Sequence, residues 1–223
     1  MDEYLSEQEQ WEWVKARIRE NGPWIVAGVA VGALLIGAWR WWQTRTEHLA
    51  LDAAARYEQI LRALDQGERA RGLSLLDQLK REHPGSPNID QGNLVAARAL
   101  VETDDMAGAA DRLREVMQGS RDPELATIAR LRLARVQTAL GKPDDALATL
   151  GPVQSGAFAA RAHEVRGDAL FAKGDRAGAL REYREAQAGG ASRLAERDVL
   201  NLKINDLLDD SNATKAPPAA AAK

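Results

Sequence analysis

The residue types that most often carry out chemistry are scarce in this sequence and stand far apart. The three histidines are His48, His83 and His163, and none lies in a cluster with carboxylates at the spacing of metal ligands. Cysteine is absent, which excludes disulfides, thiolate metal sites and a cysteine nucleophile. A phosphate-binding glycine loop and a nucleophile elbow are also missing. The sequence therefore predicts no enzyme, no cofactor and no metal site.

Paired aspartates are a second kind of candidate, because two neighbouring carboxylates can divide general acid and general base work between them. The pairs are Asp104-Asp105, Asp144-Asp145 and Asp209-Asp210. The first two pairs stand where a helix is expected to begin. An aspartate at that place caps the helix and is stabilised by the helix dipole. We therefore interpret these two pairs as structural.

The composition favours packed helices and gives no sign of nucleic-acid binding. The 223-residue chain has a formal net charge of −3, so a nucleic acid is not expected as its partner. All six tryptophans lie at or before residue 42. The core of the remaining chain must then be built from Ala, Leu and Val, which suits closely packed helices.

The first element that the sequence predicts is an apolar helix. Residues 21–39 carry no charged side chain, and as a helix they would be about 28 Å long, close to the thickness of a bilayer's hydrocarbon core. Trp24 stands at one end and Trp39, Trp41 and Trp42 at the other, as in the aromatic belts of membrane helices. A cleaved signal peptide and a buried core helix are the alternatives, but the tryptophan-rich end is a poor cleavage site and no polar face is present. We expect a transmembrane helix over 23–43.

The residues around this helix bear on its orientation and contacts. Residues 1–22 are expected to form a cytoplasmic amphipathic segment that ends at a helix break at Gly22-Pro23. Three basic residues precede the apolar helix and two follow it closely, which favours a C-terminal domain outside the cytoplasm. Gly28 and Gly32 stand four residues apart, a spacing that lets a second membrane helix approach closely, although glycine is common in such helices.

Residues 44–210 read as helix, short break and helix, repeated, with no strand-like alternation, so the fold class is all-α. Small residues recur as Gly72, Ala109, Ala146 and Ala179, close to the roughly 34-residue period of tetratricopeptide repeats. We expect a tetratricopeptide-like α-solenoid of about four helix pairs, with a capping helix over 192–208 and a disordered tail over 211–223. A helical bundle with a coincidental period is the alternative.

The first helix of each pair lines the concave face of a tetratricopeptide stack. Its inward positions mix aliphatic side chains with charges of both signs, and arginine recurs at one register position, which suits an acidic or C-terminal carboxylate partner. Asp168 occupies that position in the last pair, so the arginines form no uniform clamp, and simple solvated helix faces are the alternative. The candidate partner surface comprises Leu94, Arg98, Val101, Ile128, Leu131, Arg135, Thr138, Arg161, Glu164, Asp168 and Phe171.

Five runs of residues carry a resemblance to a known family. They are Glu20-Asn21-Gly22 before the apolar helix, Trp39-Arg40-Trp41-Trp42 after it, 131–137 (LRLARVQ), 166–170 (RGDAL) with 173–175 (KGD), and 202–207 (LKINDL). With the order of the parts, they make the chain resemble the ancillary subunit of the bacterial SecYEG translocon over nearly its whole length. The Pro- and Ala-rich tail after residue 210 departs from that family.

The resemblance implies a single-span inner-membrane protein with a periplasmic tetratricopeptide-like domain that binds the SecYEG translocon. It implies work beside a membrane-anchored periplasmic chaperone of prolyl-isomerase type, with transfer of exported polypeptides to periplasmic chaperones. A tethered scaffold for a division or outer-membrane assembly complex, an envelope stress regulator and an enzyme with an unrecognised site are the alternatives.

Overall fold

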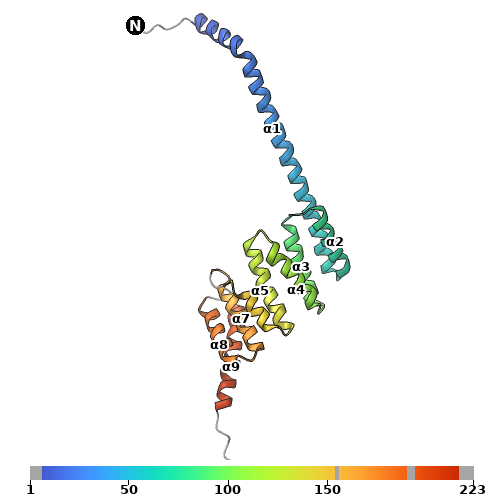
Figure 1. The fold of residues 1–223 in the computed structure, drawn as a ribbon, viewed down its shortest axis with the longest axis vertical. Coiled ribbons are helices and arrows are strands. Elements are labelled where there is room, and N and C mark those ends of the chain that lie inside the picture. Colours follow the sequence, from blue (N-terminus) through green and yellow to red (C-terminus); the bar gives the residue numbers. More distant parts are fainter. Residues whose placement is uncertain (1–6, 154–155, 190–193, 216–223) are drawn as a thin grey trace, which may run out of the picture. The chain divides into compact units, whose positions relative to one another are not determined.

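The computed structural model describes residues 7–153, 156–189 and 194–215, and every regular element in these ranges is a helix (Figure 1). The chain divides into two compact units, Met1–Asp52 and Ala53–Lys223. The helices are α1 (Glu7–Asp65), α2 (Arg69–Glu82), α3 (Asn88–Glu102), α4 (Met106–Gly119), α5 (Pro123–Ala139), α6 (Pro143–Leu150), α7 (Ala159–Ala172), α8 (Arg176–Ala188) and α9 (Leu194–Lys215). The all-α prediction is confirmed.

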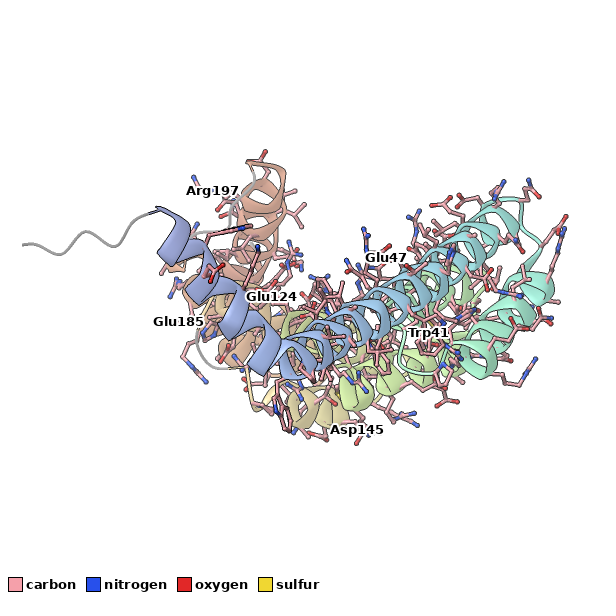
Figure 2. The ribbon with its side chains drawn as sticks, turned by 90° about the horizontal axis from the view of Figure 1, so that it is seen from above. Trp41, Glu47, Glu124, Asp145, Glu185 and Arg197 are labelled. Atoms are coloured by element: carbon pink, nitrogen blue, oxygen red, sulfur yellow. The ribbon has the colours of Figure 1, made fainter. Side chains whose placement is uncertain are left out.

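The first unit contains the apolar part of α1, whose described large apolar side chains are largely exposed. Trp24 is 80% exposed and Leu34 is 73% exposed, an arrangement that water would strongly disfavour. Trp41, which is 61% exposed, and the exposed Glu47 are labelled in Figure 2. Among the described residues, this is the one helix long and apolar enough to cross a membrane.

Helix α1 does not break at Gly22-Pro23, so that expectation is wrong. It runs without interruption from Glu7 to Asp65 with Pro23 inside it. A proline removes one backbone hydrogen bond and crowds the preceding turn, which bends a helix without having to end it. Figure 1 shows α1 changing direction near its N-terminal end.

The second unit is built of helix pairs that share continuous apolar clusters. The end of α1 packs on α2 through Ile60, Leu76 and Leu79. The next cluster joins α3, α4 and α5, and a third joins α5, α6 and α7. Because each cluster includes helices of neighbouring pairs, no pair buries its apolar surface alone, as in a solenoid.

The turns between paired helices explain the predicted breaks. Gly67, Gly141 and Gly174 have positive φ angles of 77°, 72° and 86°, a conformation that favours glycine. The corresponding turn of the second pair places Asp104 at φ 62°, which aspartate tolerates better than most residues. Asp105 then caps α4 by accepting a hydrogen bond from the Gly108 backbone N–H at 3.0 Å. The capping interpretation is confirmed for Asp105. It is wrong for Asp144 and Asp145, which lie in the first turn of α6 after Lys142 and make no capping hydrogen bond there.

Helix α9 closes the C-terminal end of the stack. Its Leu200, Ile204 and Leu207 are buried against residues of α8 that include Tyr183. Beyond the expected end at residue 208, α9 continues to Lys215, so residues 211–215 are helical instead of disordered. The rest of the predicted tail, 216–223, lies outside the described residues, as do 192 and 193 of the predicted capping helix.

Candidate functional site

A groove between α3 and α5, with α4 beneath it, is the candidate partner site. Its volume is about 360 Å³, and we call it the α3–α5 groove. Four of the sequence-predicted surface residues line it, namely Leu94, Arg98, Val101 and Arg135. The remaining lining residues are Ala97, Glu102, Leu113, Arg132 and Val136.

The floor of the α3–α5 groove is apolar and belongs to the hydrophobic core. Leu94 is only 8% exposed and packs in one cluster with Ala97, Leu113 and Val136. Val101, on the last turn of α3, is 36% exposed and offers a side chain to a ligand. The floor is therefore rigid, because it is held by the same contacts that hold α3, α4 and α5 together.

The rim of the groove is positively charged. Arg98 Nε donates to Glu102 Oε1 at 2.8 Å, and this hydrogen bond raises the pKa of Arg98. The Arg135 guanidinium lies 3.6 Å from Glu164 Oε2. Arg132 has no carboxylate within ion-pair distance among the described residues. Burial lowers the pKa of Arg132, and repulsion by Arg135, Arg98 and Arg161 lowers it further.

Arg132 is the cation in the groove lining that the sequence did not predict. In the repeat register it corresponds to Val95 and Val165, which are half-buried and fully buried. The register therefore predicts an apolar core residue at this position. The one available signal was arginine at a position that is valine in the two neighbouring pairs.

Leu131 is a correction to the predicted surface. It is 3% exposed and packs with Ala134 and Leu150 in the core between α5 and α7, so it is not available to a partner. Ile128 and Thr138 are half-buried on α5, and the Thr138 hydroxyl donates to the Ala134 carbonyl at 2.9 Å. Neither of these two residues lines the α3–α5 groove.

The two predicted carboxylates on α7 are bound by the protein's own capping helix. Lys203 of α9 donates to Glu164 Oε1 at 3.1 Å and to Asp168 Oδ1 at 2.7 Å. The Tyr183 hydroxyl donates to the same Asp168 oxygen at 2.8 Å. Both carboxylates of the last pair are therefore already bound by side chains of this chain. The exposed Phe171 at the end of α7 lies under the Arg176 guanidinium, 5.4 Å from the ring centre.

The Tyr183–Asp168 hydrogen bond predicts a loss of stability at alkaline pH. Burial raises the pKa of Tyr183 well above 10, and the Asp168 carboxylate raises it further. The folded state therefore holds this proton more tightly than the unfolded state, so its contribution is complete below pH about 10 and declines above it. We expect the unfolding free energy of the wild type to decrease more steeply above pH 10 than that of Tyr183→Phe, by up to about 1.4 kcal/mol per pH unit. Urea titrations between pH 8 and pH 11 test this, and equal slopes would contradict it.

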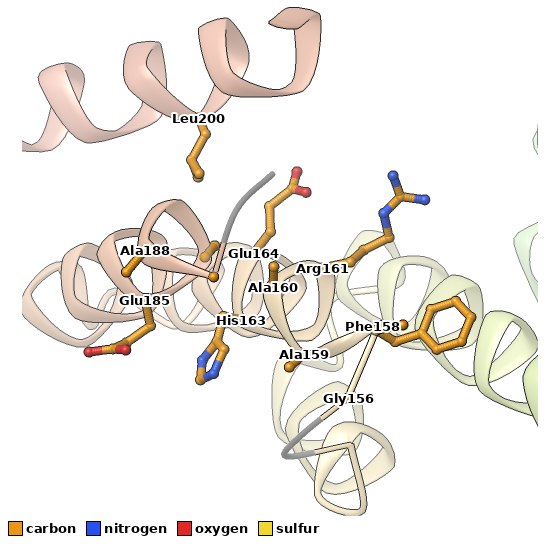
Figure 3. A pocket seen from close by; sticks show the side chains of 13 residues that line it. Gly156, Phe158, Ala159, Ala160, Arg161, His163, Glu164, Glu185, Ala188 and Leu200 are labelled. Atoms are coloured by element: carbon orange, nitrogen blue, oxygen red, sulfur yellow. The ribbon is translucent and has the colours of Figure 1, made fainter. Parts of the chain in front are cut away.

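A second cavity of about 780 Å³ lies among α7, α8 and α9 (Figure 3). Arg161 and Glu164 point to one side of α7 and His163 to the other. His163 Nδ1 lies 2.7 Å from Glu182 Oε2, and Glu182 is not among the lining residues. The lining residues include no Ser, Thr, Cys or Lys. Within the described ranges, no group of three or more His, Cys, Asp and Glu is placed to hold a metal ion. The cavity therefore offers no arrangement that would assign a reaction to it.

Solved structures support the fold. The MamA RS-1 ArsTM double mutant aligns with 74% of this chain and 97% of its own, with a TM-score of 0.52 and 15% sequence identity. MamA 41-end from Desulfovibrio magneticus RS-1 aligns over the same shares with a TM-score of 0.50 and 16% identity. At these identities, the likeness concerns the helical architecture alone.

Sequence comparisons cover nearly the whole chain. The tetratricopeptide repeat-like domain family matches residues 15–209. The ancillary SecYEG translocon subunit of Escherichia coli K12 is 30% identical over 207 residues, which are 93% of this chain and 99% of the relative. The protein of the same name from Haemophilus influenzae is 29% identical over 203 residues, 91% and 98% of the two chains. The chain therefore belongs to the family of ancillary SecYEG translocon subunits, with a domain of the tetratricopeptide repeat-like type.

Proposed function

We propose that this protein is an interaction subunit of the SecYEG translocon, anchored in the inner membrane by α1, that helps exported polypeptides reach periplasmic chaperones. The observation that carries the proposal is the near-complete alignment with translocon subunits, which includes both the exposed apolar helix and the helix pairs. The α3–α5 groove supplies a surface on which a polypeptide segment could rest. A membrane-anchored chaperone of prolyl-isomerase type is the second proposed partner.

We propose that the N-terminus is cytoplasmic and that the helix pairs lie in the periplasm. Lys15, Arg17 and Arg19 before the apolar segment outnumber Arg40 and Arg45 after it, which favours this orientation. Alkaline phosphatase fused after Lys223 is expected to be active, because that enzyme becomes active only when it is exported to the periplasm. A green fluorescent protein fused at the same place is expected to stay dark, and fluorescence without phosphatase activity would reverse the orientation.

The apolar helix is proposed to dock on its partner through Gly28 and Gly32. A β-carbon added at either position would meet nothing within 4 Å in this chain, so both are open to a second helix. A photoreactive residue at Gly28 or Gly32 is expected to crosslink to a translocon subunit or to the prolyl-isomerase-type chaperone. The matched control is Ala30, which lies on the opposite side of the same helix. Crosslinks to a division or outer-membrane assembly protein instead would support the alternative scaffold function.

Transfer of polypeptides calls for its own experiment. A photoreactive residue at Val101, inside the α3–α5 groove, is expected to crosslink to exported polypeptides in cells. Leu140 is the control, because it is 38% exposed, close to the 36% of Val101, and lies outside the groove. Equal capture from both positions would show that contact with exported chains is not specific to the groove.

A further inference from the structure

The α3–α5 groove combines an apolar floor with a positively charged rim, and this combination restricts what it can bind. Its volume of about 360 Å³ is near the lower end of the roughly 300–1,000 Å³ typical of ligand pockets. That space suits a short polypeptide segment and excludes a folded domain. The apolar floor requires that at least one side chain of the segment be apolar, since a polar group placed there would lose its hydration.

The positive charge on the rim indicates that the bound segment is also acidic. Arg98 and Arg135 each have a carboxylate of their own chain, Glu102 at 2.8 Å and Glu164 at 3.6 Å. Arg132 lines the same groove without such a partner among the residues described.

The ion pair of Arg135 is loose, because Glu164 is shared with Lys203 of α9, whose Nζ lies 3.1 Å from it. The groove therefore carries more positive than negative charge on its rim. Arg132, which lies near Arg98 and Arg135, lines the space that a ligand would fill.

We infer that the α3–α5 groove binds an acidic segment of a partner polypeptide, with an apolar side chain on the floor of Leu94, Ala97 and Val136 and an adjacent carboxylate on Arg132. This inference rests on the proposed function, of which it specifies the substrate class. A guanidinium offers a carboxylate two parallel N–H donors, so the contact is directional as well as electrostatic. An incoming carboxylate would also offset the repulsion among Arg98, Arg132 and Arg135.

The inference is tested with labelled peptides and the full chain in detergent. The probe is a twelve-residue peptide with a central leucine–glutamate–glutamate sequence among alanine and serine. Leucine–glutamine–glutamine and serine–glutamate–glutamate versions separate the contribution of charge from that of the apolar contact. In fluorescence anisotropy, each version is expected to bind about tenfold more weakly than the parent peptide, and added salt is expected to weaken the parent most. Equal binding of the three peptides, or no binding of any of them, would overturn the inference.

Substitutions on α5 test whether the peptide carboxylate binds Arg132. The Arg132→Gln change is expected to weaken binding of the parent peptide about tenfold and to leave binding of the leucine–glutamine–glutamine peptide unchanged. Arg130→Gln is the matched control, because Arg130 lies two residues away on the same helix and does not line the groove. The melting temperature of Arg132→Gln is expected to equal or exceed that of the wild type, because the change removes a repelled charge. A lower melting temperature, or equal weakening in the Arg130 variant, would contradict the assignment.

Reversing the charge of Arg132 and of the peptide together tests whether the two charges interact directly. The Arg132→Glu variant is expected not to bind the parent peptide. It is expected to bind a peptide in which both glutamates are replaced by lysines. Failure of this exchange overturns the inference even if Arg132→Gln weakens binding. The crosslinks from Gly28 and Gly32 report on the translocon independently, so failure of the peptide binding alone would leave the proposed function standing.

Discussion

Arginines in place of Val29 and Leu34 are expected to abolish membrane association of this protein. Each arginine near the centre of a membrane helix costs about 2.5–3.5 kcal/mol on insertion, and the two together exceed what the remaining apolar residues can readily offset. The helix pairs should still fold, because Val29 and Leu34 are 67% and 73% exposed and lie in the separate N-terminal unit. The double variant is therefore expected in the soluble fraction, with an unchanged helical circular dichroism signal per residue.

The matched control for this experiment lies on the same helix. Leu49 and Leu51 are 49% and 68% exposed on α1, beyond the apolar segment. Replacing both by arginine is expected to leave the protein in the membrane fraction after carbonate extraction. Release of this control, or retention of the Val29 and Leu34 variant, would show that the apolar segment does not anchor the chain.

Gly167→Ala is expected to destabilise the helix pairs by about 1–3 kcal/mol, although alanine is the better helix former. Gly167 is buried on α7, and a β-carbon there would lie 2.5 Å from Cδ1 of Tyr183. The Tyr183 ring cannot move away freely, because its hydroxyl is bound to Asp168 and its ring is packed against α9. The clash therefore outweighs the gain of roughly 0.5–1 kcal/mol that glycine-to-alanine changes give in open helices.

Urea unfolding of the wild type and of Gly167→Ala measures this difference in the free energy of unfolding. Gly119→Ala is the control, since a β-carbon at that helical position meets nothing within 4 Å, and its stability is expected to be equal or slightly higher. In a Tyr183→Ala background, the cost of Gly167→Ala is expected to fall toward zero, because the clashing ring is gone. An undiminished cost in that background would assign the effect to something other than the Tyr183 contact.

The sequence was most informative where local chemistry dictates local structure. The predicted breaks between helices fall at Gly67, Gly141 and Gly174, where the turn needs a positive φ, and Asp105 marked a helix start. Each of these signals acts within a few residues. Pro23 misled because a proline weakens a helix by one hydrogen bond, which the long α1 tolerates without ending.

By itself, the sequence determined that this is an all-α chain with one apolar helix and a series of helix pairs, because periodicity, turn residues and hydropathy are local properties. Only the tertiary structure decided which face of α5 is open: Leu131 turned into the core, and Arg132 came to line the groove. Only the tertiary structure showed that Lys203 of α9 binds Glu164 and Asp168. The physical reason is that charge and exposure at these positions depend on helices distant in sequence, which a repeat register cannot place to within one residue.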